Sequence, residues 1–517
     1  MPKRGEPSTP PTDTVPQAIL DALGADGAKW ITGLLERMAH AERRAMVAEQ
    51  RVARLELELA AAQRRIGELE EENRVLRARL NQDSSNSSRS PSSDGPGAKA
   101  SQRRKGKRKP SGRKAGGQPG HEGRTRDLEP VEKADTVVDH FPDTCGLCGE
   151  GLSGAPEVGD PVAHQQYEIP PLRLHLIHHW LHRLTCPRCG SETLARLKAE
   201  EATGQGPRLT AFIGLLTSHN RQSRSLVRDL IDDLFGLRLS TGTVQACFER
   251  IGEALRGPVA ELERALPSVD AVHLDETGWR LWGKRCWLWV ATTTAFSLFM
   301  IHPLRGADAL RQWFPNGFKG TVHSDRWSAY SVFDIALRQL CWAHLGRDLQ
   351  AIIDAEGNAA GLATSIRAGE AEMFRHWRAF RAGTIDRARL QALTAPFRAR
   401  FGSFCQQGAA QAADDLWRKL GVDMIRKWPA VFRFLDVEGL EPTNNAAERA
   451  VRPGVIWRKL SQGTRSDAGS ACVARTLSVT ATCRKRHIDV LGYLTDALLC
   501  HWRGIPPPDL LGPHHRP

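Results

Sequence analysis

The chain has 517 residues, with 72 Lys and Arg against 59 Asp and Glu, and therefore a formal net charge of +13. At roughly 100–200 residues per domain, this length allows about three to five domains. No apolar run is long enough to cross a bilayer, which excludes a membrane protein. The N-terminal sequence lacks the apolar core of a secretory signal, so we expect a bacterial cytoplasmic location, where the 11 cysteines are free thiols or metal ligands.

Residues 1–29 are rich in Pro and Thr and are predicted to be disordered. Residues 30–80 lack Pro and carry a heptad pattern typical of a coiled coil. The a positions are Val52, Leu59, Ile66, Asn73 and Leu80, and the d positions are Leu55, Ala62, Leu69 and Leu76. Asn at an a position favours two strands, because a buried amide is satisfied opposite its twin. We therefore predict a homodimer or higher oligomer, with an intramolecular helical hairpin as the alternative.

Residues 81–130 form a polar linker that continues into a basic arm. The stretch 99–126 holds eleven basic residues and one acidic residue, and so carries +10 of the total charge. Such a charge concentration predicts binding to nucleic acid, and Gly and Pro keep the arm extended. A solvated charge run without sequence preference is the alternative. The expected DNA-binding residues of the arm are Arg103, Arg104, Lys105, Lys107, Arg108, Lys109, Arg113 and Lys114.

Two copies of the pattern C-x-x-C-G lie within residues 131–200, and they predict a zinc-binding domain. Cys145 and Cys148 form the first pair, and Cys186 and Cys189 form the second. Four thiolates suit one structural Zn²⁺ ion, and the Gly after each pair permits a tight turn. Since four thiolates close the site, the histidines between the pairs are interpreted as polar surface residues. A redox role for each C-x-x-C pair is the alternative.

Residues 207–260 are predicted to form three short helices, the last of them capped by Ser240 or Thr241. This arrangement is similar to a helix-turn-helix, in which the final helix reads DNA. A plain helical core is the alternative.

Residues 268–465 show three strands, a helix, a strand, a helix and a strand, which is the order of a ribonuclease H-like α/β core. In that core, carboxylates at the ends of the first and fourth strands stand side by side, and here those ends carry Asp275 and Asp325. A later helix supplies Glu448 as a third carboxylate. Three convergent carboxylates suit two Mg²⁺ (or Mn²⁺) ions per active site, which support in-line attack on a phosphodiester.

Each of the three acids also has a structural interpretation. Asp275 could pair with a Lys, and its neighbour Glu276 is a rival, although successive strand residues point to opposite faces. Asp325 could be a helix N-cap. Glu448 lies three residues after Asn445, as in a capping box. The three acids together, on the expected elements, favour catalysis.

At these residues the sequence resembles the large (TnpC-type) transposases of the insertion-sequence-66 family, which are DDE transposases. The resemblance extends over most of the chain, and it is specific because its motifs occur together. The motifs are NSSRSPSSD, GGQPGHEGRTR, the paired C-x-x-C, DET at 275–277, HSDRWSAY, CWAHLGRD, NNAAERAVRP with Arg458 and Lys459, and the helical tail SVTATCRKRHIDVLGYL.

The resemblance implies that Asp275, Asp325 and Glu448 are the acidic triad. It also implies a helical insertion at about 346–439 and a C-terminal helical domain at 466–505. Arg326-Trp327 stands where the family more often has Gly-Tyr, and Gly346 where a basic residue is usual. These departures leave the acids in place but weaken the case for DNA contacts there.

Four further residues follow from the same motifs. Cys341 and His344 belong to the CWAH signature, where His344 contacts a phosphate or both residues serve packing. Arg452 and Lys459 follow Glu448 on one helical face if the helix continues past Pro453, and they are expected to contact the DNA backbone.

Together these features predict a multidomain α/β DNA transposase in the bacterial nucleoid. It would bind terminal inverted repeats, cut at the element's ends and join them to target DNA, with or without small accessory proteins. One alternative is a non-catalytic, dimeric zinc protein that regulates through DNA binding. The other is a ribonuclease H-like nuclease that cuts without joining.

Overall fold

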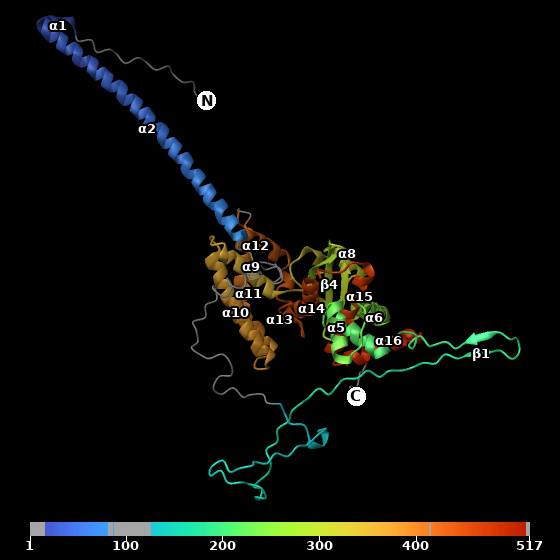
Figure 1. Ribbon diagram of the computed structural model, residues 1–517. Helices are drawn as coiled ribbons and strands as arrows, with labels where there is room; N and C mark the ends of the chain where they lie inside the picture. The colour runs from blue at the N-terminus through green and yellow to red at the C-terminus, as the bar shows by residue number, and fades with distance from the viewer. Residues whose placement is uncertain (1–15, 81–85, 87–125, 413–414, 513–517) are drawn as a thin grey trace. The chain divides into compact units, whose positions relative to one another are not determined.

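The computed structural model describes residues 16–80, 86, 126–412 and 415–512, and it separates the chain into two units, Met1–Gln82 and Asp83–Pro517. The basic residues of the predicted arm, from Arg103 to Lys114, lie outside the described residues. Within the described ranges, no helix is both long and apolar enough to cross a membrane. The described part is helix-rich and contains a mixed sheet, which agrees with the predicted α/β class (Figure 1).

The first unit is dominated by one helix, α2 (Gly24–Leu80), which has 57 residues and is therefore about 85 Å long. It is preceded by the short helix α1 (Gln17–Ala22), visible at the blue end of the chain in Figure 1. The boundary of disorder predicted at residue 29 is therefore too late. The reason is local: Pro16 precedes the first helical turn, and apolar Ile19 and Leu20 follow it on a helix-forming stretch.

The segment from residue 126 to residue 206 has little regular structure. A two-stranded antiparallel hairpin joins β1 (Arg183–Thr185) and β2 (Glu192–Leu194), and one 3-10 turn, η2 (Val131–Lys133), precedes it. The hairpin encloses the second C-x-x-C pair, and an isolated bridge between Thr144 and Gly151 encloses the first.

A five-stranded mixed sheet forms the centre of the second unit, with strand order β5-β4-β3-β6-β7. Its strands are β3 (Ala271–Leu281), β4 (Lys284–Thr292), β5 (Ser297–His302), β6 (Thr321–Ser324) and β7 (Arg338–Leu340). The first three strands form an antiparallel meander, whereas β6 and β7 run parallel to β3. Helix α8 (Ala307–Trp313) connects the edge strand β5 to β6 on the other side of β3.

Both faces of the sheet are covered by helices. Even- and odd-numbered residues of a strand point to opposite faces and pack into two different hydrophobic clusters. Leu274 and Trp289 face α8 and the following 3-10 turn, whereas Trp279 and Leu288 face α14 (Asn445–Ser461) and α15 (Asp467–Lys485). This alternation follows from the pleat of a strand. Asp275 shares its parity with Trp279 and therefore lies on the α14 face.

Two details between β6 and α9 differ from the sequence prediction. The expected helix after β6 is instead a pair of 3-10 turns, η4 (Ser328–Val332) and η5 (Ile335–Leu337). The expected strand RQLCWAH stops after three residues, because Cys341 already precedes the first turn of α9 (Trp342–Asp354). Only eight residues lie between Asp325 and Asp334, which caps η5, and this short span is divided between the turn after Asp325 and η4.

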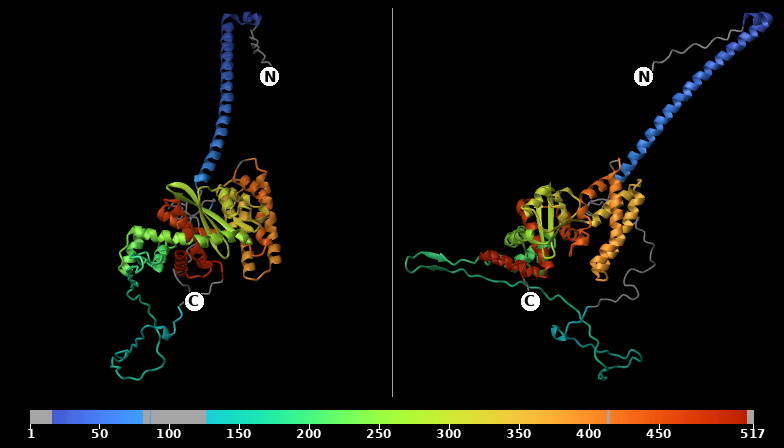
Figure 2. Two further views of the ribbon diagram at one scale, coloured as in Figure 1. Left: turned by 90° about the vertical axis from the view of Figure 1, so that its right-hand side faces the viewer. Right: turned by 180° about the vertical axis from the view of Figure 1, so that it is seen from behind.

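A helical insertion lies between β7 and α14 and has its own hydrophobic core. After α9 it contains α10 (Ala360–Arg381), α11 (Arg387–Ala409), α12 (Leu416–Arg426) and α13 (Arg433–Asp436). Trp342 stands at the centre of this core, where its indole N–H donates to the Val431 carbonyl at 2.8 Å. These helices begin at Trp342, slightly before the predicted start of the insertion at residue 346. They are drawn in yellow to orange in Figure 2.

Helices from both ends of the unit complete the core. The three helices predicted at 207–256 are α4 (Pro207–Thr217), α5 (Arg224–Phe235) and α6 (Thr241–Ala254), followed by α7 (Arg256–Ala265). Ser240 caps α6, as expected, by accepting the Thr243 N–H at 2.9 Å. Helices α15 and α16 (Val490–Arg503) contribute Leu477 and Leu494 to the clusters around the sheet. The tail at 466–505 is therefore part of the sheet's core rather than a separate domain.

Candidate active site

Asp275 lies in the middle of β3, not at its end as the sequence predicted, because the strand continues for six residues as a hairpin with β4. The parallel pairing with β6, however, stops at His273, which is level with His323. Asp275 lies two residues after His273 within β3, and Asp325 lies two residues after His323, just past the end of β6, so this register brings the two acids to the same level of the sheet. The prediction that both acids stand side by side thus has a geometric basis.

The charges around Asp275 are unusual for a half-buried acid. Burial raises the pKa of Asp275 well above that of an ordinary aspartate, and the negative charges of Glu276, Asp325 and Glu448 raise this pKa further. This rise is opposed by a hydrogen bond from the Glu276 N–H, which donates to Asp275 Oδ1 at 2.9 Å and lowers the pKa. No Lys pairs with Asp275 among the described residues.

Asp325 follows the last residue of β6, and its backbone is fixed from two sides. Its Oδ1 accepts the Trp327 N–H at 2.8 Å, which closes the turn before η4. Its carbonyl oxygen accepts from the buried Arg338 guanidinium at 3.1 Å. The capping interpretation of Asp325 is wrong, because Trp327 precedes the first residue of η4 and no side chain caps it; the Asp325 side chain instead stabilises the turn before η4. The same hydrogen bond also fixes the carboxylate beside Asp275.

Glu448 lies in the first turn of α14 and completes the group of acids. Its Oε1 lies 3.1 Å from the Arg347 guanidinium and 3.6 Å from His344 Nδ1, both on α9. The capping-box alternative fails, because the helix is preceded by Asn444 and no side chain caps it. Glu448 therefore points toward α9 and the other acids.

Asn444 anchors the start of α14 against β3. Its side-chain amide donates to the Leu274 carbonyl at 2.7 Å, and its Oδ1 lies 3.0 Å from His273 Nδ1. Its backbone N–H contacts Cys341 Sγ at 3.1 Å. Because Leu274 and His273 immediately precede Asp275, these contacts fix Glu448 relative to Asp275. Asn444 belongs to the NNAAERAVRP motif, but its position in the sequence does not reveal these contacts.

Glu276, the rival acid, points to the opposite face of the sheet, as predicted. Its side chain is 2% exposed and lies 2.8 Å from the Arg305 guanidinium, while the Tyr330 hydroxyl donates to it at 2.5 Å. Burial raises the pKa of Glu276, and Arg305 partly offsets that rise. Since both carboxylate oxygens have partners, Glu276 is a structural acid. Arg305 and Tyr330 were not singled out from the sequence.

The two departures from the family pattern have structural reasons. Arg326 forms ion pairs with Asp348 of α9 at 2.8 Å and Asp423 of α12 at 2.7 Å, so its charge holds the helical insertion beside Asp325. At Gly346, a Cβ atom would come within 2.5 Å of Arg367 and 2.7 Å of Glu370. A larger residue there would require the ends of the Arg367 and Glu370 side chains on α10 to move.

Helix α14 continues through Pro453, as the predicted DNA contacts require. Arg452 and Lys459 are both exposed, which keeps their charges available. Arg458 instead turns inward and donates to the Gly278 carbonyl at 2.6 Å. Arg458 therefore ties α14 to β3, whereas Lys459 stays exposed.

The two C-x-x-C pairs form matching turns. In each, the N–H of the following glycine donates to the first cysteine's carbonyl at 2.9 Å, and Gly149 and Gly190 adopt positive φ angles of 77° and 68°. Hydrogen bonds lower the pKa of Cys145, from the backbone of Cys148, and of Cys189, from Ser191. The described residues do not gather these thiols into one four-cysteine group, and the zinc site stays a prediction.

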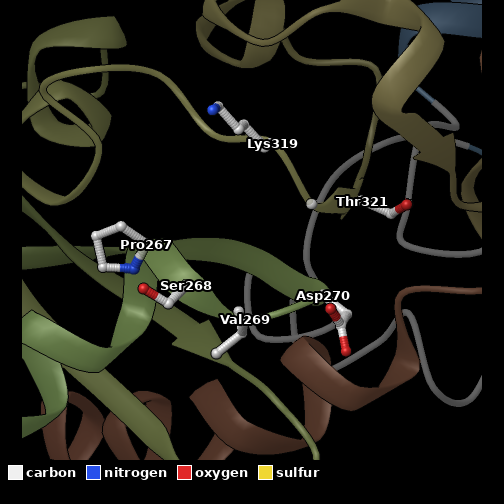
Figure 3. A pocket seen from close by; sticks show the side chains of 7 residues that line it. Pro267, Ser268, Val269, Asp270, Lys319 and Thr321 are labelled. Carbon is white, nitrogen blue, oxygen red and sulfur yellow. The ribbon is translucent and has the colours of Figure 1, made fainter.

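A hollow of about 450 Å³ lies at the other end of the parallel strands. It is lined by residues 267–270 before β3 and by residues 319–321, the last of which begins β6 (Figure 3). Asp325 follows the opposite end of β6, so this hollow is separate from the group of acids.

Comparison with known proteins gives a consistent result. Residues 206–471 match the Transposase IS66 family, and residues 35–127 match a family of unknown function (DUF6444). The uncharacterized protein y4hP of Sinorhizobium fredii is 26% identical over 419 residues, 71% of this chain and 72% of that protein. Two other uncharacterized proteins of this bacterium, y4qI and y4jO, are 25% and 28% identical over 43% and 52% of their lengths, and over 41% and 34% of this chain.

The raised pKa of Asp275 predicts the effect of removing its charge on stability. Because the folded-state pKa lies above the unfolded one, the wild type loses stability as the pH rises from the unfolded pKa toward the folded pKa. At neutral pH without added divalent metal, Asp275→Asn should therefore have a higher free energy of unfolding than the wild type. We expect an increase of roughly 0.5–2 kcal/mol, the usual size of a stabilising substitution, measured by urea denaturation.

This difference should disappear below about pH 4, where the wild-type carboxyl is protonated in both states. The exposed Asp308→Asn, on α8, is the matched control and should change the free energy of unfolding by less than about 0.5 kcal/mol. A less stable Asp275→Asn protein at neutral pH would contradict the electrostatic interpretation.

Proposed function

Because the chain belongs to the IS66 family of transposases, we propose that Asp275, Asp325 and Glu448 form an active site that cleaves and joins DNA strands at the ends of an insertion sequence. The observation that carries this proposal is the raised pKa of Asp275, whose causes include the charges of both other acids. Clusters of carboxylates that disfavour one another's ionisation are typical of functional sites.

The strand order supports a ribonuclease H-like core. An antiparallel meander is followed by a helix and two parallel strands, so that β3 lies at the centre of the sheet. This is the order expected from the sequence. The short β6 and the 3-10 turns change the lengths of the elements but not their sequence.

The donor set of the three acids fits divalent magnesium or manganese. Their ligand atoms are all carboxylate oxygens, which hard cations prefer, and Asp275 itself pairs with no Lys or Arg among the described residues. When bound, two such ions activate the attacking oxygen and stabilise the leaving oxygen of the phosphodiester. Asp275, Asp325 and Glu448 would hold these ions.

The remaining residues would bind and orient the DNA. Arg452 and Lys459 are placed to contact phosphates along exposed positions of α14. The basic residues within 81–130, most of which lie outside the described residues, would bind the phosphates of terminal inverted repeats or of target DNA through their charge. Residues 236–240 connect α5 to α6 and begin with Gly236 in the left-handed conformation, as is common in a helix-turn-helix, and α6 is the candidate reading helix.

Asp275→Asn, Asp325→Asn and Glu448→Gln should each abolish Mg²⁺-dependent cleavage of the element's own ends. DNA affinity should stay within about twofold, because the phosphate contacts lie elsewhere. The experiment measures nicking of labelled ends and, separately, binding by fluorescence anisotropy. Asp308→Asn, which removes an exposed carboxylate of α8, should cleave as the wild type does.

Pre-cleaved ends test the joining step. A transposase should transfer their 3′ ends to target DNA, whereas a nuclease that only cuts gives no joined product. Cleavage that survives in the Asp275→Asn protein would contradict the assignment of the active site, and wild-type binding without any cleavage would favour the regulatory alternative.

The exposed apolar row of α2 supports self-association as a coiled coil. The a and d residues Val52, Leu55, Leu59 and Ile66 are each more than half exposed in the single chain, so they lack the partner that a heptad seam requires. Asn73 bonds to the Leu69 carbonyl at 3.2 Å within its own helix. We include a parallel homodimer, or a higher oligomer, in the proposal.

Leu59→Asp should shift the full chain toward monomers in light scattering, because an ionised carboxylate in the seam is desolvated. Leu57→Asp is the matched control: Leu57 lies on the same helix and is 73% exposed, but it occupies an f position outside the seam. Equal effects of the two substitutions would exclude this seam as the interface.

A further inference from the structure

A second group of potential metal ligands overlaps the acids at Glu448. Cys341, His344 and Glu448 each offer one ligand atom, and these atoms all lie within 4.8 Å of one another. Among the described residues, this is the one group of three or more such side chains that meets this condition. It combines a sulfur, an imidazole nitrogen and a carboxylate oxygen.

The group is held in place by contacts between two helix starts. The Trp342 N–H, at the start of α9, donates to the Pro442 carbonyl at 2.9 Å, and the Asn444 N–H, before α14, contacts Cys341 Sγ at 3.1 Å. Cys341 is 2% exposed. These contacts hold the Cys341 thiol against the start of α14, the helix whose first turn carries Glu448.

His344 provides a second and independent observation. Its Nδ1 is buried and has no hydrogen-bond partner, and it lies 3.6 Å from Glu448 Oε1, too far for a hydrogen bond. A tetrahedral ion with nitrogen and oxygen ligands at its usual bond lengths would separate those ligands by about 3.4 Å. The observed separation therefore fits two ligands of one ion.

The chemistry of the donors selects the class of ion. Mg²⁺ avoids sulfur and prefers six oxygens, whereas Zn²⁺ and its analogues Co²⁺ and Cd²⁺ accept thiolate, imidazole and carboxylate together. Three protein ligands leave a fourth position for water. Two features oppose tight binding, since burial raises the pKa of Cys341 to about 11 and Arg347 lies 3.1 Å from the same Glu448 oxygen.

We propose that Cys341, His344 and Glu448 bind a thiophilic divalent cation of the zinc class, which competes with the catalytic metal for Glu448. On binding, the Cys341 thiol releases its proton to solvent as sulfur bonds to the ion, and the ion keeps its oxidation state. The competition rests on the proposed function of Glu448, but the binding itself does not. The site would make the enzyme sensitive to the balance of zinc and magnesium.

Cobalt is the probe for binding, because thiolate-to-Co²⁺ charge transfer absorbs in the near ultraviolet. We expect the full-length wild type to show the charge-transfer absorption of one additional thiolate per chain compared with Cys341→Ser. Both proteins keep the C-x-x-C thiols, which therefore cancel in the comparison. Cys405→Ser is the matched control, since Cys405 is also buried but lies among the insertion helices; it should retain the full absorption.

His344→Asn removes a nitrogen ligand without disturbing the Asn444 contact to Cys341, and it should weaken cobalt binding by at least roughly tenfold. It thereby keeps the test decisive if Cys341→Ser folds poorly. Identical cobalt spectra for the wild type, Cys341→Ser and His344→Asn would overturn the proposed site.

Electron paramagnetic resonance of Mn²⁺ tests the competition without relying on activity. Zn²⁺ should release Mn²⁺ from the wild type at a concentration at least roughly tenfold lower than from Cys341→Ser. Equal release from both would overturn the competition. Asp275→Asn should lose Mn²⁺ but keep the cobalt absorption, so a failure of the proposed function can be told apart from a failure of this site.

Discussion

The central constraint on this structure is that the carboxyl groups of Asp275, Asp325 and Glu448 lie close together at a half-buried position. Asp275 shows the effect most clearly, since burial and three neighbouring carboxylates all raise its pKa. Holding these carboxylates close together costs free energy, and the surrounding fold must be rigid enough to maintain their positions. Here the rigidity comes from the paired strands β3 and β6, whose register sets Asp275 and Asp325 level, and from Asn444, which fixes the start of α14 to β3.

The arginines near the acids each have a partner of their own. Arg305 is paired with Glu276 on the opposite face, and Arg326 is paired with Asp348 and Asp423 of the insertion. Arg347 is paired with Glu448, and the buried Arg338 donates to the Asp325 carbonyl. The insertion helices thus brace the loop after Asp325 and supply His344 and Arg347, which links the helical part of the chain to the chemistry proposed for the sheet.

Several parts of this arrangement were predictable because their signals are local. Alternating apolar residues and aromatic content predict β3, β4 and β5, and Ser240 before an apolar helix predicts the start of α6. Asp275, Asp325 and Glu448 could be proposed as a group because they follow the elements expected of one core. Contacts between distant residues were not predictable: Arg305 and Tyr330 lie 29 and 54 positions from Glu276, and nothing near them in the sequence marks the pairing. The heptads of α2 are likewise clear, but their partner cannot be seen in one chain.

The most direct test of the central claim is anomalous diffraction from crystals of the full chain grown with Mn²⁺. The account predicts Mn²⁺ bound to carboxylate oxygens of Asp275, Asp325 and Glu448 at about 2.0–2.3 Å, a typical range for divalent ions with oxygen ligands, and loss of that density in Asp275→Asn. A structure in which manganese is bound elsewhere, while Arg347 or another side chain closes over these three carboxylates, would contradict it.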